Sequence, residues 1–350
     1  MQEQISSISD FLKQGNFHFR VFDMGRRVTQ LSNSLFMKIE NQQELYPYPF
    51  QQSAWIAVLF WDKHKKDEPV IWFLKFPIDE LGYLQLSSRD AFMQQLIDQL
   101  GTSLQEKQQG KPVSDALKES PFAFKPKQDR LAIFHSKASK ALGQAPSQYY
   151  EHTLNYINGS IGYDQWAFLG LQGIADMVAR LDENNNEIKL SKAIAKLPDT
   201  PLEIFCNMLE HSEPKRELSQ ALVQKIDTEI ENKNSKMLAA LTRALSHSQI
   251  DSLRFATWEK LLASELASEI EILAALSGRA WNDLKDKSLL KQFLTALADC
   301  TQEQFNILLF DLMAIPTLRE PILSTMREPE RSQALSEKIG KFFELLRVRS

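Results

Sequence analysis

The chain has 350 residues, of which 43% are hydrophobic and 25% are charged, and its formal net charge is −4. This length and composition indicate a globular protein of about two domains with a sizeable core. The nearly balanced charge gives no field that would imply a nucleic acid or an anionic membrane surface as a partner.

The N-terminus, the apolar runs and the cysteines bear on the cellular compartment. The first residues, MQEQISSISDFL, lack the basic start and the apolar segment of a secretory signal. The longest apolar run, AWIAVLFW at 54–61, is too short for a membrane span, which needs about 20 residues. Cys206 and Cys300 are far apart in the sequence and fit a reducing compartment better than a disulfide framework. We therefore expect a cytoplasmic protein.

Residues 1–107 predict an α+β domain with a small antiparallel sheet. A short helix over 5–14 is followed by FHFRVFD at 17–23, whose alternating apolar residues predict a strand. A turn at Gly25 leads to a second strand, and an amphipathic helix is expected over 34–43. The prolines of YPYPF at 46–50 then end that helix, because each removes a backbone donor.

The strongest strand signal is a hairpin that is apolar on both faces. Its strands are SAWIAVLFWD and PVIWFLKFPID, joined by the polar loop HKKDE at 64–68. A hairpin of this kind must be covered on both sides. We expect the helices within 1–14 and 34–43 to cover one face, and a long helix over 88–107 to cover the other.

The composition changes after this unit. Residues 108–125 are rich in Gly, Pro, Ser and Lys, which is typical of an exposed linker. Residues 126–350 contain no alternating segment of strand length, so we expect an all-helical domain. The two predicted domains are therefore 1–107 and 126–350.

The helical half contains a repeat from about residue 200 to residue 315. Four apolar pairs at i, i+3 recur at spacings of 36, 35 and 36 residues: Leu202/Phe205, Leu238/Leu241, Leu273/Leu276 and Leu309/Leu312. A period near 35 with two helices per unit is typical of an α-solenoid of HEAT or TPR size. The tryptophan, glycine and tyrosine positions of the TPR consensus are not evident in these repeats. We therefore favour a HEAT-like solenoid, with a non-repetitive helical bundle as the alternative.

The sequence holds no motif that assigns a cofactor, a metal or a catalytic residue. It lacks a P-loop, GxGxxG, HExxH, paired CxxC and an EF-hand loop. None of its six histidines lies three or four residues from another His or Cys, the spacing of a local metal-ligand pair. Asn158-Gly159-Ser160-Ile161-Gly162 resembles a nucleophile elbow, but a helix precedes it instead of a strand. We interpret this stretch as a helix stop.

Two predicted helices around that stop carry the candidate ligand or partner site. The first is expected to begin after Ser147 and carries a line of Tyr149, His152 and Tyr156. The second, expected over 164–181, is apolar on nearly all sides but carries one polar stripe, and Gly170 and Gly173 allow another backbone to approach it closely. The candidate residues are Tyr149, His152, Tyr156, Trp166, Gln172, Asp176 and Arg180.

A polar stripe on a buried helix needs partners, because an unpaired buried polar group costs about 1–3 kcal/mol. The stripe can hydrogen-bond across the seam between the two domains, or it can line a groove for a small molecule or peptide. A catalytic role is a third interpretation, in which His152 acts as a base that Asp176 orients.

Several strings of the chain resemble a protein family. They are VFDMGRRV, LYPYPFQQSAWIAVLFW, VIWFLKFPIDELG and QYYEHTLNYINGSIGYDQWAFLGLQGIADMVARLD. They are similar to those of a gammaproteobacterial family catalogued only as a domain of unknown function. The resemblance is strongest over 17–182 and implies a bacterial cytoplasmic protein, but it transfers no activity and no site residue.

These observations lead to one main functional hypothesis and two alternatives. We expect a non-enzymatic interaction or scaffold protein whose helical-repeat domain binds a protein or peptide partner. The alternative is a small-molecule or enzymatic pocket at the seam between the domains. A third hypothesis, nucleic-acid binding, rests only on residues 111–140, where seven Lys or Arg stand against three acids.

Overall fold

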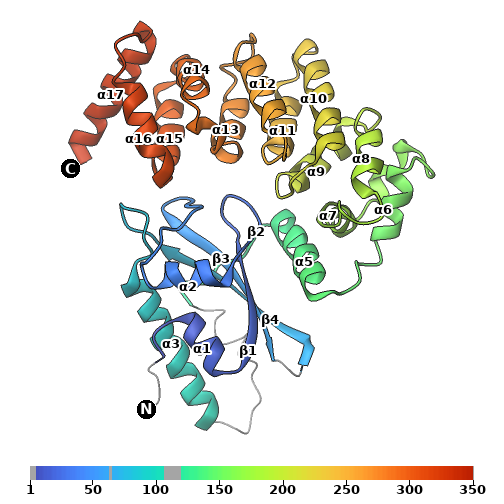
Figure 1. Ribbon diagram of the computed structural model, residues 1–350, viewed down its shortest axis with the longest axis vertical. Helices are drawn as coiled ribbons and strands as arrows, with labels where there is room; N and C mark the ends of the chain where they lie inside the picture. The colour runs from blue at the N-terminus through green and yellow to red at the C-terminus, as the bar shows by residue number, and fades with distance from the viewer. Residues whose placement is uncertain (1–4, 63–64, 106–119, 350) are drawn as a thin grey trace. The chain divides into compact units, whose positions relative to one another are not determined.

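A computed structural model of the chain describes residues 5–62, 65–105 and 120–349. The chain forms two compact units (Figure 1). The sheet unit contains residues 1–130 together with 314–316, and the helical unit contains residues 131–313 and 317–350. The class expected from the sequence, an antiparallel sheet with helices followed by a helical region, is confirmed.

The sheet unit has four strands and three helices in its described part (Figure 1). Its elements are α1 (Ile8–Gln14), β1 (Phe17–Asp23), β2 (Thr29–Leu31), α2 (Asn33–Glu40), β3 (Ser53–Asp62), β4 (Lys65–Pro77) and α3 (Leu86–Gln105). The strands are all antiparallel in the order β2-β1-β3-β4. α2 ends before the predicted residue 43, because Gln42 adopts a left-handed φ of 52°.

One face of the sheet holds the core of this unit. Alternate residues of β3 and β4, among them Val58 and Leu74, pack with side chains of α1, α2 and α3 in a single cluster. In this cluster the ring of Trp72 lies 6.1 Å from that of Phe11 in α1 and 6.1 Å from that of Phe92 in α3. The expectation that α3 would cover the opposite face was therefore wrong.

The opposite face is contacted by the segment that follows the undescribed residues. Residues 106–119 lie outside the described part, and they include the end of the predicted helix 88–107 and residues 108–119 of the predicted linker 108–125. Residues 120–124 run beside β4, where the backbone N–H of Lys75 donates to Phe122 and that of Phe124 donates to Phe73. The ring of Phe124 packs edge-on against Trp55 at 4.9 Å between centroids.

Two buried carboxylates tie loops and helix ends to this core. Asp23 accepts hydrogen bonds from the Tyr46 hydroxyl at 2.5 Å and from the backbone N–H groups of Gly25 and Arg27. Glu40 accepts from the backbone N–H groups of Ile8 and Ser9 at the start of α1. Burial raises the pKa of Asp23 to about 6 and that of Glu40 to about 7.

The helical unit consists of helices joined by short connections (Figure 1). Its α-helices are α5 (Gln128–Leu142), α6 (Tyr150–Ile157), α7 (Leu171–Ala179), α8 (Asn186–Ile194), α9 (Asp199–Leu209), α10 (Arg216–Glu231), α11 (Ser235–Leu245), α12 (Asp251–Leu262), α13 (Ile270–Arg279), α14 (Lys287–Ala298), α15 (Gln302–Met313), α16 (Pro316–Met326) and α17 (Gln333–Arg349). Two short 3₁₀ helices are η1 (Tyr163–Phe168) and η2 (Asp283–Lys285).

Alternate helices of this unit contact one another and form two layers. The first layer runs α7, α9, α11, α13 and α15, and the second runs α8, α10, α12 and α14. The four apolar pairs found in the sequence lie in α9, α11, α13 and α15, which are successive members of the first layer, and all eight side chains are buried. The recurring pairs therefore belong to the apolar core of the layered helices.

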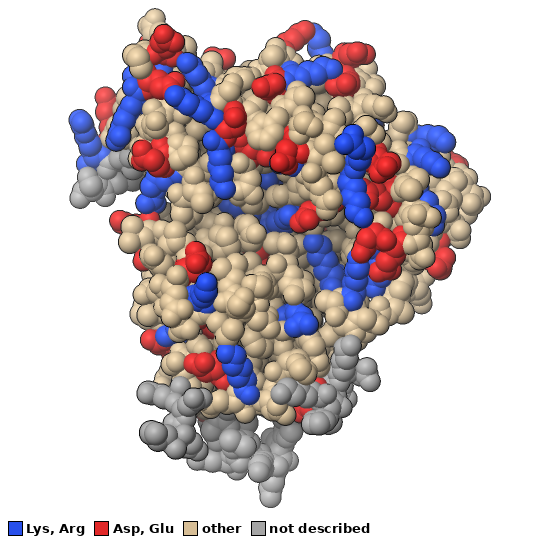
Figure 2. All heavy atoms as spheres, in the orientation of Figure 1, with Lys and Arg blue, Asp and Glu red and all other residues tan. Residues whose placement is uncertain are grey.

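The surface carries charges of both signs. On the face shown in Figure 2, acidic and basic side chains are interspersed, and no broad surface of a single charge is in view. Among the described residues, no helix combines the length and the apolar character needed to cross a bilayer.

Candidate functional site

The stretch 158–162 forms the turn expected from the sequence. α6 ends at Ile157 with Asn158 as its C-cap, and Gly159 and Gly162 adopt positive φ values of 76° and 79°. Because a helix leads into Ser160, the strand-to-helix geometry of a nucleophile elbow is not present here. α6 does not begin directly after Ser147, as expected from a serine cap; its N-cap position is Tyr149, whose side chain makes no capping hydrogen bond.

The helix expected over 164–181 is two separate pieces. η1 ends at Phe168, the backbone is extended at Leu169 and Gly170, and α7 begins at Leu171. No residue of η1 is buried, and the side chain of Phe168 is 74% exposed. The expectation of one continuous buried helix was therefore wrong for its first turn and a half.

The two glycines of this region permit close packing against the start of α6. A Cβ atom on Gly173 would lie 2.5 Å from the carbonyl oxygen of Tyr149 and 2.5 Å from the hydroxyl of Thr153. A Cβ atom on Gly170 would lie 3.1 Å from the Tyr149 ring. Both glycines thus allow α7 to approach α6 at backbone distance, as the sequence led us to expect.

The predicted line of Tyr149, His152 and Tyr156 does not form one surface. The Tyr149 side chain is 48% exposed and His152 is also exposed, whereas Tyr156 is fully buried. The Tyr156 hydroxyl donates to the carbonyl of Tyr163 at 3.0 Å, and burial raises the pKa of Tyr156 to about 12. Trp166, the fourth aromatic candidate, is half-buried in η1.

The polar stripe of α7 meets partners within the helical unit. Gln172 donates to the Ser136 hydroxyl of α5 at 2.7 Å. Asp176 is buried and accepts from the backbone N–H of Ser147 at 2.8 Å, and its second carboxylate oxygen lies 3.3 Å from Arg180 Nη1.

Arg180 completes this arrangement. Its Nη2 donates to the carbonyl of Gln144 at 3.1 Å. Asp176 and Arg180 therefore both hold the connection between α5 and α6, which contains Gln144 and Ser147. In the described part of the chain, no hydrogen bond or ion pair joins His152 to Asp176, the pair considered for catalysis.

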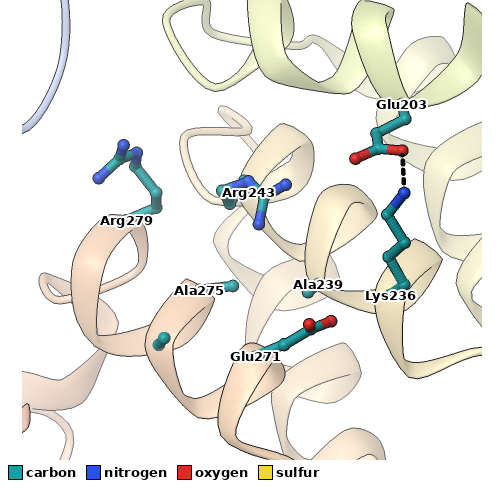
Figure 3. Close-up of a pocket in the computed structure, with 8 residues that line it drawn as sticks. Glu203, Lys236, Ala239, Arg243, Glu271, Ala275 and Arg279 are labelled. Atoms are coloured by element: carbon teal, nitrogen blue, oxygen red, sulfur yellow. Dashed lines mark ion pairs between the residues drawn. The ribbon is translucent and has the colours of Figure 1, made fainter.

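A groove lies elsewhere on the helical unit, on the surface of the first layer. Its volume is about 390 Å³. The residues that line it come from α9, α11 and α13: Glu203, Lys236, Ala239, Arg243, Glu271, Ala274, Ala275 and Arg279 (Figure 3). We call it the α11–α13 groove, because seven of these eight residues belong to those two neighbouring helices.

The two ends of the groove carry different charges. At one end Arg279 Nη2 lies 2.9 Å from Glu210, and Arg243 Nε lies 3.5 Å from the same carboxylate. At the other end Lys236 pairs with Glu203 at 2.8 Å, an ion pair that raises the pKa of Lys236 (Figure 3). Glu271 lies on the same side as this pair and is exposed.

One position of the 35–36-residue repeat marks this groove in the sequence, although neither the leucine pairs nor the polar stripe of α7 predicted it. Glu203, Ala239 and Ala274 each follow the first leucine of a recurring pair, so they occupy one position of the repeat. Large side chains at that position of α11 and α13 would fill the space that the alanines leave open. Arg243 and Arg279 both stand in the last turn of their helices, where a cation is favoured.

In the described part of the chain, no group of three or more His, Cys, Asp or Glu side chains is arranged to hold a metal ion. A family model described as a protein of unknown function (DUF3549) matches residues 3–343, and the chain belongs to this family. No curated protein and no solved structure matches the chain.

Proposed function

We propose that this DUF3549 member is a non-enzymatic interaction protein of the cytoplasm, and that its helical unit binds a protein or peptide segment in the α11–α13 groove. The observation that carries this proposal is an open groove of about 390 Å³ along two neighbouring helices, with alanines at its base and charged groups at its ends. Grooves between helices are a common site for an amphipathic segment of a partner.

The stacking of the helices supports the same proposal. Successive members of each layer contact one another, and all eight side chains of the recurring pairs are buried. This arrangement favours a HEAT-like α-solenoid, a class whose extended surfaces bind other proteins. A fold of this class does not determine an activity. The specific support for the proposed function is therefore the groove.

The alternative pocket around Tyr149, His152 and Asp176 is less well supported. Asp176 and Arg180 are buried and already hold backbone groups of the α5–α6 connection. A ligand at this stripe would have to displace those hydrogen bonds. The exposed rings of Tyr149 and Phe168 can still contribute a secondary contact surface.

Photo-crosslinking in the source organism tests the proposal. A photoreactive phenylalanine analogue at position 274 should give a defined adduct with one partner protein. Position 256 is the matched control, because Ala256 is an exposed alanine of second-layer helix α12 and lies outside the groove. The same adduct at both positions, or no adduct at position 274, would contradict the proposal.

Binding of the purified partner then completes the test. Ala274→Trp should fill the groove and weaken the affinity for that partner at least tenfold in calorimetry. Ala256→Trp adds the same ring to the same unit and should leave the affinity unchanged. Equal affinities of the two variants would exclude the groove as the binding site.

A further inference from the structure

We infer that the occupant of the α11–α13 groove is a helical segment with an acidic side chain that binds Arg243 and Arg279 and a basic side chain that binds Glu271. This inference rests on the proposed function and adds the chemistry of the partner. It follows from the charges at the two ends of the groove, their separation and the shape of the groove base.

The arginine end has an excess of positive charge. Arg243 and Arg279 share a single carboxylate, that of Glu210, so one positive charge is left uncompensated when His211 is neutral. In the described structure Arg279 Nε is buried without a hydrogen-bond partner. A guanidinium offers five N–H donors and favours a carboxylate as its partner, so this end suits a second carboxylate.

The opposite end has an excess of negative charge. Glu203 and Glu271 stand there with the one ammonium group of Lys236, which pairs with Glu203. Glu271 is exposed, and within the described residues it belongs to no ion pair. This end therefore suits a Lys or Arg side chain of a partner.

The dimensions of the groove fit a helix. Glu271 and Arg279 are eight residues apart on α13, which corresponds to about 12 Å along a helix axis. On α11 the lining residues recur every three or four positions, and on α13 the alanines at 274 and 275 stand between Glu271 and Arg279, so each helix contributes one row of side chains with alanine in its middle. The ridge of a third helix fits into such a groove. An acid and a base eight residues apart on that helix would reach both ends.

Glu210 acts in this arrangement as an internal competitor for the partner's carboxylate. It occupies the two arginines in the free protein and is itself almost completely buried. Removal of the Glu210 charge should make the N–H donors of Arg243 and Arg279 available to the carboxylate of the partner. The inference therefore predicts that Glu210→Gln binds an acidic segment more tightly than the wild-type chain does, whereas a purely structural ion pair predicts only a loss of stability.

Titration of the isotope-labelled full-length protein with synthetic peptides tests the inference. The first peptide is a helical Ala/Gln sequence with Glu and Lys eight residues apart. The second carries Gln in place of that Glu, and the third has the composition of the first but places Glu and Lys four residues apart. Binding is followed through the arginine Nε–Hε resonances and the dissociation constant.

We expect the first peptide to shift the Arg243 and Arg279 resonances and to bind at least tenfold more tightly than the other two. Ala274→Trp and Arg279→Met should each weaken its binding at least tenfold, and Glu210→Gln should strengthen it. The peptide comparison on the wild-type chain remains decisive if a variant fails to fold.

Equal binding of the Glu and Gln peptides would overturn the inference, as would the absence of binding by all three. Binding that Ala274→Trp leaves unchanged would place the peptide outside the groove and would also overturn it. The proposed function is decided separately by the crosslink at position 274. A crosslinked partner that places no acidic side chain against Arg279 would therefore contradict the inference and leave the proposed function intact.

Discussion

The sheet unit and the helical unit stabilise their buried carboxylates in different ways. In the sheet unit, Asp23 and Glu40 accept hydrogen bonds mainly from backbone N–H groups and hydroxyls, and burial raises the pKa of both. In the helical unit, Asp176 and Glu210 pair with arginines. Removing an acid therefore has different consequences in the two units.

Within the helical unit, one arginine–carboxylate site is fully buried and another is partly exposed to solvent. Asp176 and Arg180 are both buried and hold backbone groups of their own unit. Arg243 and Arg279 keep part of their surface exposed in the groove, with 26% and 16% of the side chain accessible. A closed pair contributes to stability, whereas a partly exposed pair can also bind a partner.

Substitution of Asp176 should have the largest effect on stability. Asp176→Ala removes the closer of the two carboxylates beside buried Arg180, leaving only the half-exposed Glu183 at 3.7 Å, and it removes the acceptor of the Ser147 N–H. We expect a loss of about 3 kcal/mol in the free energy of unfolding, the low end for a broken buried pair, because Glu183 still compensates part of the Arg180 charge. Urea unfolding measures it. Glu151→Ala, on the exposed face of α6, is the control and should change little.

The free energy of unfolding should depend on pH through the titration of the Glu40 carboxyl. Its pKa lies near 7 in the folded chain and near 4.5 unfolded, so the fold favours the protonated carboxyl. The stabilisation is fully present below pH 4.5 and is lost as the pH rises through 7. Glu40→Gln should remove this loss, which is on the order of 2–3 kcal/mol between pH 5 and pH 8.

Urea unfolding at several pH values checks the Glu40 prediction. Glu44→Gln is the matched control, because Glu44 is exposed in the same unit, and it should keep the wild-type profile. Asp23 adds a similar decline between pH 3.8 and about 6, which should persist in both variants. A Glu40→Gln profile that parallels the wild type would show that this carboxyl is not the source.

Two glycines of first-layer helices should respond to alanine in opposite directions. Gly173→Ala places a Cβ atom against the Tyr149 backbone and should lower the free energy of unfolding by about 1.5 kcal/mol. Gly278, in α13, has no atom within 4 Å of its added Cβ atom. Gly278→Ala should therefore raise stability by about 0.5 kcal/mol through helix propensity. Destabilisation of equal size at both positions would contradict the close approach of α7 to α6.

Local periodicity predicted the elements of both units well. The alternation of FHFRVFD predicted β1 with the bounds Phe17–Asp23 that the structure shows. The leucine pairs spaced by 35 or 36 residues predicted which helices neighbour one another. These patterns succeed because each reflects burial along a single element.

The contacts between elements could not be predicted in the same way, because the sequence of a single helix or strand does not determine which neighbour it packs against. The hairpin is apolar on both faces, so its sequence could not decide which face α3 covers. Apolar residues around 164–181 indicated a buried helix, yet the backbone is extended at Gly170, and the rings of η1 remain at the surface. The groove depends on the register between α11 and α13, which brings Arg243 and Arg279 to one carboxylate.

The smallest expected effect on stability concerns the exposed charged side chains of the α11–α13 groove. It tests directly whether these side chains are available to a partner. Lys236→Gln removes the ion pair with Glu203 but leaves no buried group unpaired, because the Lys236 side chain is 72% exposed. The urea midpoint should stay unchanged within error, since exposed pairs contribute little to stability. At the same time, the two acids at this end lose their only ammonium group. A basic segment should therefore bind this end more tightly, and a variant that unfolds more easily would show that the pair belongs to the fold instead.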